Sequence, residues 1–127
     1  MKFSQEEIEM ARELRRLGLK WEPSVGHYVY DENRCCQRGS PFQDRLYFIL
    51  NYERFMSHIG GVERFKEVML WLPTWHDARE LLRSLGVSDE KVAFRLQDCK
   101  ALENRNELKV LYEMIAQLLP GQAIKDG

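Results

Sequence analysis

The feature that most constrains the fold is the stretch from residue 61 to residue 85, where a dense apolar run meets a clear helix start. Pro73 must end the structure that precedes it, because the residue before a proline is pushed toward extended geometry. Thr74 then follows as a predicted N-cap, and Asp77 stands three residues later to complete a capping box. The sequence therefore predicts a helix from Thr74 to Gly86, where the glycine favours termination.

Two interpretations of the segment before Pro73 remain open. A helical stripe and the alternation of a strand buried on both faces can both be drawn through it. The helical stripe contains Val62, Phe65, Met69 and Leu72, and the strand contains Val68, Leu70 and Leu72 on one face with Met69 and Trp71 on the other. Because the apolar run before the proline is short, we favour a short helix over residues 62–67 followed by a strand to Leu72.

Length and charge restrict the class of protein. A chain of 127 residues is expected to form a single domain and to bury a core without disulfides. Its net charge of −1 provides no general attraction to nucleic acid or to an anionic membrane, so both are disfavoured as partners. The acidic first residues and the lack of a long apolar run predict a cytoplasmic protein with no transmembrane segment. Three cysteines fit reduced thiols better than a disulfide framework.

The first half of the chain predicts one helix, two strands and a second, short helix. Ser4 with Glu7 forms a capping box for a helix that ends at Gly18. Residues 25–30 have the composition of a strand, and residues 33–41 are expected to form a loop. The apolar run 45–50 predicts a central strand that is covered on both faces. Asn51 then caps a short helix that ends at Gly60.

The second half predicts helices and completes the fold class. Helices are expected after Ser88 and over residues 108–119, and residues 121–127 are expected to fray. Cys99 is expected on the buried face of the helix that begins at Ser88. The predicted fold is α+β and helix-rich, a small, mostly antiparallel sheet of two or three strands covered by about five helices.

The first candidate site is the corner around Pro73. Free backbone N–H groups at the helix start could hold an anion or a carboxylate beside the tryptophans. Its residues are Trp71, Thr74, Trp75 and His76. The alternative is that the tryptophans are packing residues that fix the turn between strand and helix.

The second candidate site combines arginines of the loop with aromatic residues of the first strand. Arg34 and Arg38 with Tyr28 and Tyr30 could bind a small anionic ligand or a protein segment. The alternative is a solvated loop over an aromatic core.

No cofactor or metal is predicted, because the histidines and cysteines show no ligand spacing. A catalytic thiol at Cys35 or Cys36 would require His27 or His76 as a neighbouring base. We therefore predict a non-enzymatic binding or protein-interaction module, with a protein partner or a small anionic ligand, and leave open a homodimer through the last helix. The alternative is a small enzyme or ligand-binding protein with a site near the Cys35/Cys36 loop and the Trp75/His76 helix start.

Overall fold

The chain is a helix-rich α+β protein, as the sequence predicts. The computed structural model describes residues 2–36 and 43–120, and within these it contains seven helices and a three-stranded sheet. Two compact units can be distinguished, residues 1–4 with 20–72 and residues 5–19 with 73–127. The predicted fraying of residues 121–127 lies outside the described residues.

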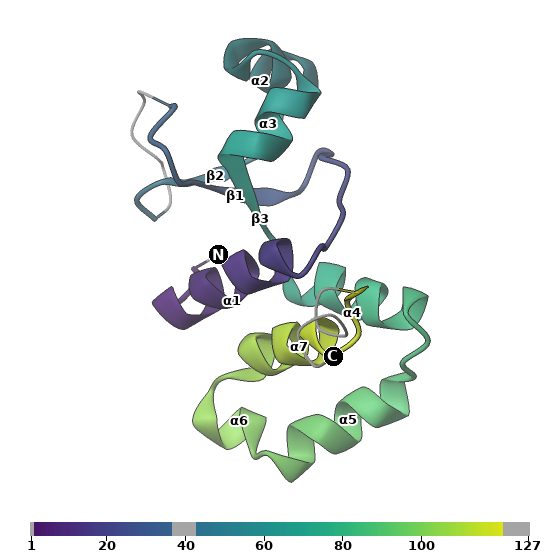
Figure 1. Ribbon diagram of the computed structural model, residues 1–127. Coiled ribbons are helices and arrows are strands. Elements are labelled where there is room, and N and C mark those ends of the chain that lie inside the picture. The colour runs from purple at the N-terminus through teal and green to yellow at the C-terminus, as the bar shows by residue number, and fades with distance from the viewer. Residues whose placement is uncertain (1, 37–42, 121–127) are drawn as a thin grey trace. The chain divides into compact units, whose positions relative to one another are not determined.

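The first unit contains the sheet and two helices (Figure 1). Its strands are β1 (Tyr28–Asp31), β2 (Leu46–Phe48) and β3 (Met69–Leu72), and its helices are α2 (Tyr52–Ile59) and α3 (Val62–Val68). The strand order is β2-β1-β3, and β1 pairs antiparallel with both neighbours. In the register, Val29 stands opposite Tyr47 on one side and Trp71 on the other.

The apolar run 45–50 forms an edge strand, so the prediction of a central strand was wrong. β1 takes the centre, and β2 has a neighbour on one side only among the described strands. The two strands are also shorter than predicted, because Gly26 and Arg45 adopt positive φ angles of 97° and 67° that a strand does not accommodate. Leu50, which follows β2, keeps 76% of its surface exposed.

The junction of α3 and β3 confirms the prediction of a short helix followed by a strand. Met69 has extended geometry, with φ −105° and ψ 135°, while its N–H still donates to the carbonyl of Phe65. The helix therefore passes into the strand without an intervening loop. All four residues of β3 are buried, as expected for a strand that is covered on both faces.

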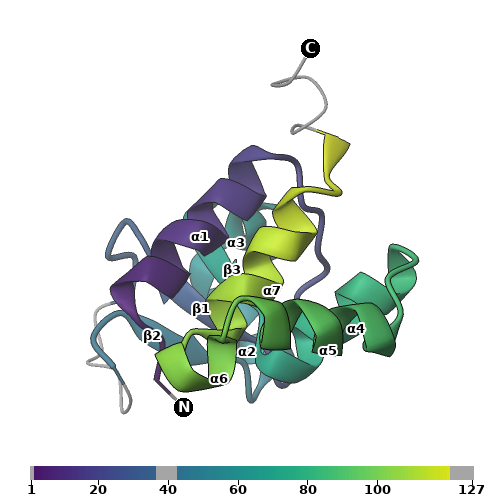
Figure 2. The ribbon, with the colours of Figure 1, turned by 90° about the horizontal axis from the view of Figure 1, so that it is seen from below.

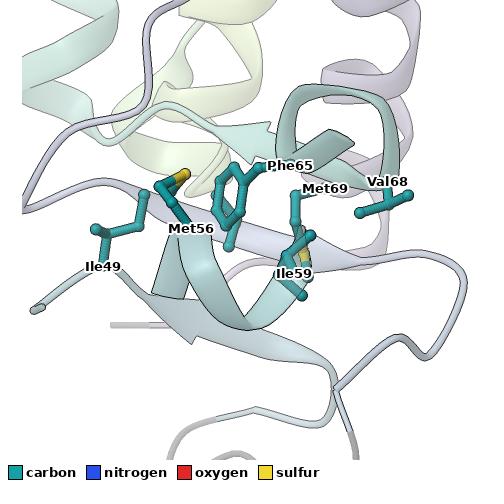
Figure 3. Packing of buried hydrophobic residues seen from close by; sticks show 7 residues of the cluster. Ile49, Met56, Ile59, Phe65, Val68 and Met69 are labelled. Carbon is teal, nitrogen blue, oxygen red and sulfur yellow. The ribbon is translucent and has the colours of Figure 1, made fainter. Parts of the chain in front are cut away.

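The core of the first unit lies between one face of the sheet and the helices α2 and α3. Figure 3 shows side chains from the sheet and from both helices gathered in this layer. The cluster consists of Val29, Ile49, Met56, Ile59, Phe65, Val68 and Met69. Gly60 ends α2 and Gly61 begins α3, so the chain reverses between the two helices. Phe65 on α3 has no exposed surface, because α3 packs on the same layer as α2.

The second unit is helical. Its elements are α1 (Gln5–Arg16), α4 (Trp75–Ser84), α5 (Asp89–Asp98), α6 (Ala101–Asn104) and α7 (Glu107–Ala116). α7 packs against α1, beside which it lies in Figure 2, and against α4. Lys109 on α7 also forms an ion pair of 3.1 Å with Glu6 on α1. The buried faces of these helices are mainly aliphatic, with Leu14, Leu82 and Leu111 fully buried.

The predicted helix starts at Thr74 and Ser88 are confirmed, and one helix was missed. Thr74 and Asp77 form the expected capping box, and Ser88 accepts a hydrogen bond from the amide of Lys91. α6 has four residues and is flanked by Lys100 and Arg105, both with φ of 55°. A segment so short shows no periodicity in sequence.

Cys99 is half-buried at the end of α5, where it forms the C-cap. Its thiol donates to the carbonyl of Arg95. Among the described residues, no helix is both long and apolar enough to cross a membrane.

Candidate functional site

A pocket opens in the first unit where β2 leads into α2. Its volume is about 480 Å³, within the range of small-ligand sites, roughly 300 to 1,000 Å³. The described residues that line it are Cys36, Tyr47, Phe48, Leu50, Asn51, Arg54, Phe55 and His58. We call this site the β2–α2 pocket.

The aromatic wall of the pocket is held by the core behind it. The ring of Phe55 lies edge-on to Phe65, with centroids 5.1 Å apart and planes at 88°. On its other side Phe55 meets Tyr47 at 6.3 Å, again edge-on. Since Phe65 is fully buried, the position of Phe55 is fixed by packing. The wall is therefore a preformed surface.

The polar side of the pocket comes from one face of α2. Arg54 and His58 are four residues apart on this helix, so their side chains leave it on the same face. Both residues are exposed, and neither forms an ion pair with the part of the chain that the structure describes. Asn51 accepts a hydrogen bond from the amide of Arg54 and caps the helix, whose positive dipole end thus opens toward the pocket.

Comparisons with protein-family models, curated proteins and solved structures found no match. The chemistry of the pocket is therefore inferred from its own side chains.

Behind the pocket, the loop after β1 is fastened by a buried carboxylate. Asp31 is only 1% exposed and accepts hydrogen bonds from the amides of Cys35 and Cys36, at 2.9 and 2.8 Å. Arg45 donates to the backbone carbonyls of Asp31 and Glu32 and so ties the two ends of the loop together.

This arrangement keeps the Cys36 thiol protonated. Burial of the thiol raises the pKa of Cys36 to about 12, and the neighbouring Asp31 carboxylate contributes in the same direction. A nucleophilic cysteine needs the opposite environment, one that lowers its pKa. The loop therefore disfavours catalysis by Cys36.

The predicted arginine and tyrosine surface is only partly assembled. Tyr28 packs against Phe48 at 4.9 Å and against Phe3 at 5.8 Å, and Tyr30 is buried. The guanidinium over the ring of Tyr30 belongs to Arg45, at 5.0 Å. Arg34 is exposed in the loop. Arg38 lies outside the described residues.

Trp71 belongs to an aromatic stack within the first unit. Its ring lies parallel to that of Trp21, with centroids 5.4 Å apart, and the ring of His27 is 5.0 Å away. His27 also lies within hydrogen-bond distance of Ser24, with Nε2 3.3 Å from the hydroxyl. Trp71 is thus engaged in packing, which was the alternative interpretation of this residue.

Thr74, Trp75 and His76 begin α4 in the second unit. The Asp77 carboxylate accepts from the amide of Thr74 at 3.0 Å, and the Thr74 hydroxyl accepts from the amide of Asp77 at 3.2 Å. The helix start is thus already occupied by a carboxylate of the chain itself, which disfavours an anion there. Trp75 and His76 are both exposed, and the guanidinium carbon of Arg79 lies 6.0 Å from the centroid of the Trp75 ring.

The pocket residues Leu50, Arg54 and His58 were missed in the sequence. One signal was present, because Asn51, Arg54 and His58 recur at helical spacing on the predicted short helix. This face lines the pocket beside β2, which is an edge strand among the described strands, whereas the sequence indicated a central strand. Within the described ranges, histidine, cysteine and acidic side chains form no group of three that could hold a metal.

Proposed function

We propose that the chain is a non-enzymatic binding module that holds a small ligand in the β2–α2 pocket. The observation that carries this proposal is the combination of an apolar wall with two exposed basic side chains in a pocket of about 480 Å³. Leu50 supports it, since a leucine that is 76% exposed at the rim would lose its contact with water when a ligand covers it.

The environment of the thiols supports binding over catalysis. The alternative, a small enzyme, needs a base beside Cys35 or Cys36. His27 is stacked on Trp71 and lies beside Ser24, and His58 lines the β2–α2 pocket together with Cys36. The high pKa of Cys36 leaves its thiol un-ionised near neutral pH. Free thiols at all three cysteines also fit the expected reducing, cytoplasmic compartment.

The experiment that tests the proposal is an NMR titration of the ¹⁵N-labelled chain with a panel of small neutral, anionic and cationic aromatic fragments. We expect saturable shifts that gather at the amides of residues 47–58. Leu50→Asp should abolish them, because a charge at the rim repels apolar ligands while an exposed position tolerates it. Val25→Asp is the matched control, since Val25 is 58% exposed and does not line the pocket. Shifts located elsewhere, or none at all, would reject the proposal.

A second candidate function is protein association through the second unit. The apolar face of α7, the helix expected to mediate a homodimer, is buried within that unit at Leu108, Leu111 and Ile115. Phe94 on α5 and Leu102 on α6 are instead 70% and 76% exposed. Sedimentation velocity at increasing concentration should show self-association that the double variant Phe94→Ser, Leu102→Ser removes. A monomer at every concentration would contradict a homodimer.

A further inference from the structure

The charge of the β2–α2 pocket restricts the class of ligand. Arg54 and His58 are its basic side chains, and none of its described lining residues is acidic. Asp31, the carboxylate that the described residues bury, accepts hydrogen bonds from the amides of Cys35 and Cys36. An exposed guanidinium that forms no ion pair with the described residues can hold a carboxylate through two parallel hydrogen bonds.

The wall of the pocket restricts the body of the ligand. Tyr47, Phe48 and Phe55 contribute aromatic rings, and Leu50 contributes an exposed aliphatic side chain. Aromatic rings favour a flat or aliphatic group that can lie on them or meet their edges. The basic side chains lie on α2, so the ligand has its charged end at Arg54 and His58 and its apolar body against the rings and Leu50.

We propose that the β2–α2 pocket binds small apolar monocarboxylates, with the carboxylate on Arg54 and His58 and the apolar body against Phe48, Leu50 and Phe55. This assignment rests on the proposed function, because it names the ligand class of the same site. It goes further by predicting which end of the ligand decides affinity.

A matched series of three probes tests the assignment. The probes 4-phenylbutyrate, 4-phenylbutanol and 4-phenylbutylamine share one apolar body and carry a negative, a neutral and a positive end. In NMR titrations we expect 4-phenylbutyrate to bind at least about tenfold more tightly than the alcohol, because one charge-assisted hydrogen bond contributes about that much to affinity. The amine should bind most weakly. Added NaCl should reduce the advantage of the carboxylate, since the pair is exposed to solvent.

A substitution identifies the group that recognises the charge. Arg54→Gln should remove the advantage of 4-phenylbutyrate over the alcohol while binding of the alcohol is retained. Arg64→Gln is the matched control, because Arg64 is exposed on α3 and does not line the pocket. Its affinities should equal those of the wild type.

The outcomes separate the two proposals. Equal affinity for carboxylate and alcohol, or tightest binding of the amine, would overturn the monocarboxylate assignment and leave the pocket as a binding site. An unchanged preference in Arg54→Gln would also overturn the assignment. No response of the pocket amides to any of the three probes would overturn both the ligand class and the proposed function.

Discussion

The two units of this chain build their interiors from different residues. All the aromatic residues except Trp75, Phe94 and Tyr112 belong to the first unit. In the second unit, aliphatic helix faces surround one buried aromatic ring, that of Tyr112. Aromatic rings bury large areas, so a small sheet with two helices can form a core from a few of them. Its edge strand then leaves the rings of Tyr47 and Phe48 half-exposed, and the pocket forms there.

The units also differ in the polar group that each one buries. The first unit buries the Asp31 carboxylate, which accepts from two backbone amides. The second buries the Tyr112 hydroxyl, which donates to the carbonyl of Pro73. Hydrogen bonds to a charged group contribute more than those between neutral groups. We therefore expect substitution at Asp31 to cost more than substitution at Tyr112.

The largest expected effect is that of Phe65→Ala in the aromatic core. Phe65 is fully buried and packs against both Trp21 and Phe55. Its truncation should lower the free energy of unfolding by about 3 to 5 kcal/mol, because it removes buried area and leaves a cavity. Urea denaturation followed by circular dichroism measures the loss.

Two further variants make this a comparison between the units. Leu111→Ala removes a fully buried aliphatic side chain from the second unit and should cost about 2 to 5 kcal/mol. Leu50→Ala, at an exposed position of the first unit, should change stability by less than about 0.5 kcal/mol. Should Phe65→Ala resemble Leu50→Ala, the first unit would not depend on its aromatic core.

The next effect is that of Asp31→Asn. The asparagine amide group would face one of the two backbone N–H donors that the carboxylate now binds, and the charge would be lost. We expect a loss of about 1.5 to 3 kcal/mol and faster hydrogen exchange at the amides of Cys35 and Cys36. Asp44→Asn, at an exposed position, is the control and should be nearly neutral. Equal losses of unfolding free energy in the two variants would show that the buried Asp31 carboxylate stabilises the fold no more than an exposed one does.

The sequence predicts best where a local rule determines the structure. The capping box of Thr74 and Asp77 and the end of α2 at Gly60 follow from neighbours within a few residues, and both are confirmed. Pro73 likewise predicts the end of the preceding strand, and β3 ends at Leu72. The helix-rich α+β class follows from adding such segments together.

The position of a strand in the sheet depends on residues far away in the sequence, and for this reason the pocket was not predicted. The run 45–50 has the composition of a covered strand, but the centre went to β1 because β3 returns to its other side. Leu50, which follows this edge strand, is exposed, and Arg54 and His58 on the next helix line the pocket. The burial of Asp31 was equally hidden, because its partners are backbone amides that every sequence provides.

Tyr112→Phe tests the buried polar group of the second unit. The substitution keeps the ring and removes the hydroxyl that donates to the Pro73 carbonyl. A loss of about 1 to 2 kcal/mol is expected, since that carbonyl is left without this donor. Tyr52→Phe is the control in the first unit, because the Tyr52 hydroxyl makes no hydrogen bond within the described residues. A loss at Tyr112 larger than that of Asp31→Asn would reverse the comparison.

The reactivity of Cys36 tests the same loop without a change in the core. With its pKa raised to about 12 by burial, the thiol should react slowly with iodoacetamide, and the rate should still be rising at pH 10. Because the folded state holds this proton more tightly, its contribution to stability is present below pH 9 and is lost toward pH 12. The rate is measured in a Cys35→Ser, Cys99→Ser variant against free cysteine. A plateau near pH 7 would indicate an activated thiol and favour the enzyme alternative.

The smallest expected effect concerns a surface charge of the second unit. Hydrogen bonds from Arg83 and Arg79 lower the pKa of Asp89 to about 2. A carboxylate with a lowered pKa stabilises the folded state above its unfolded value, about 3.9, and loses this contribution as the pH falls toward 2. Asp89 is exposed, so solvent screens the pair and the effect on stability should be slight. NMR titration of the Asp89 carboxyl carbon, in the wild type and in Arg79→Gln, Arg83→Gln, should show the pKa return to its ordinary range in the variant. An unchanged pKa would mean that these arginines do not hold Asp89, and that the surface charges of the second unit contribute nothing comparable to the buried charge of the first.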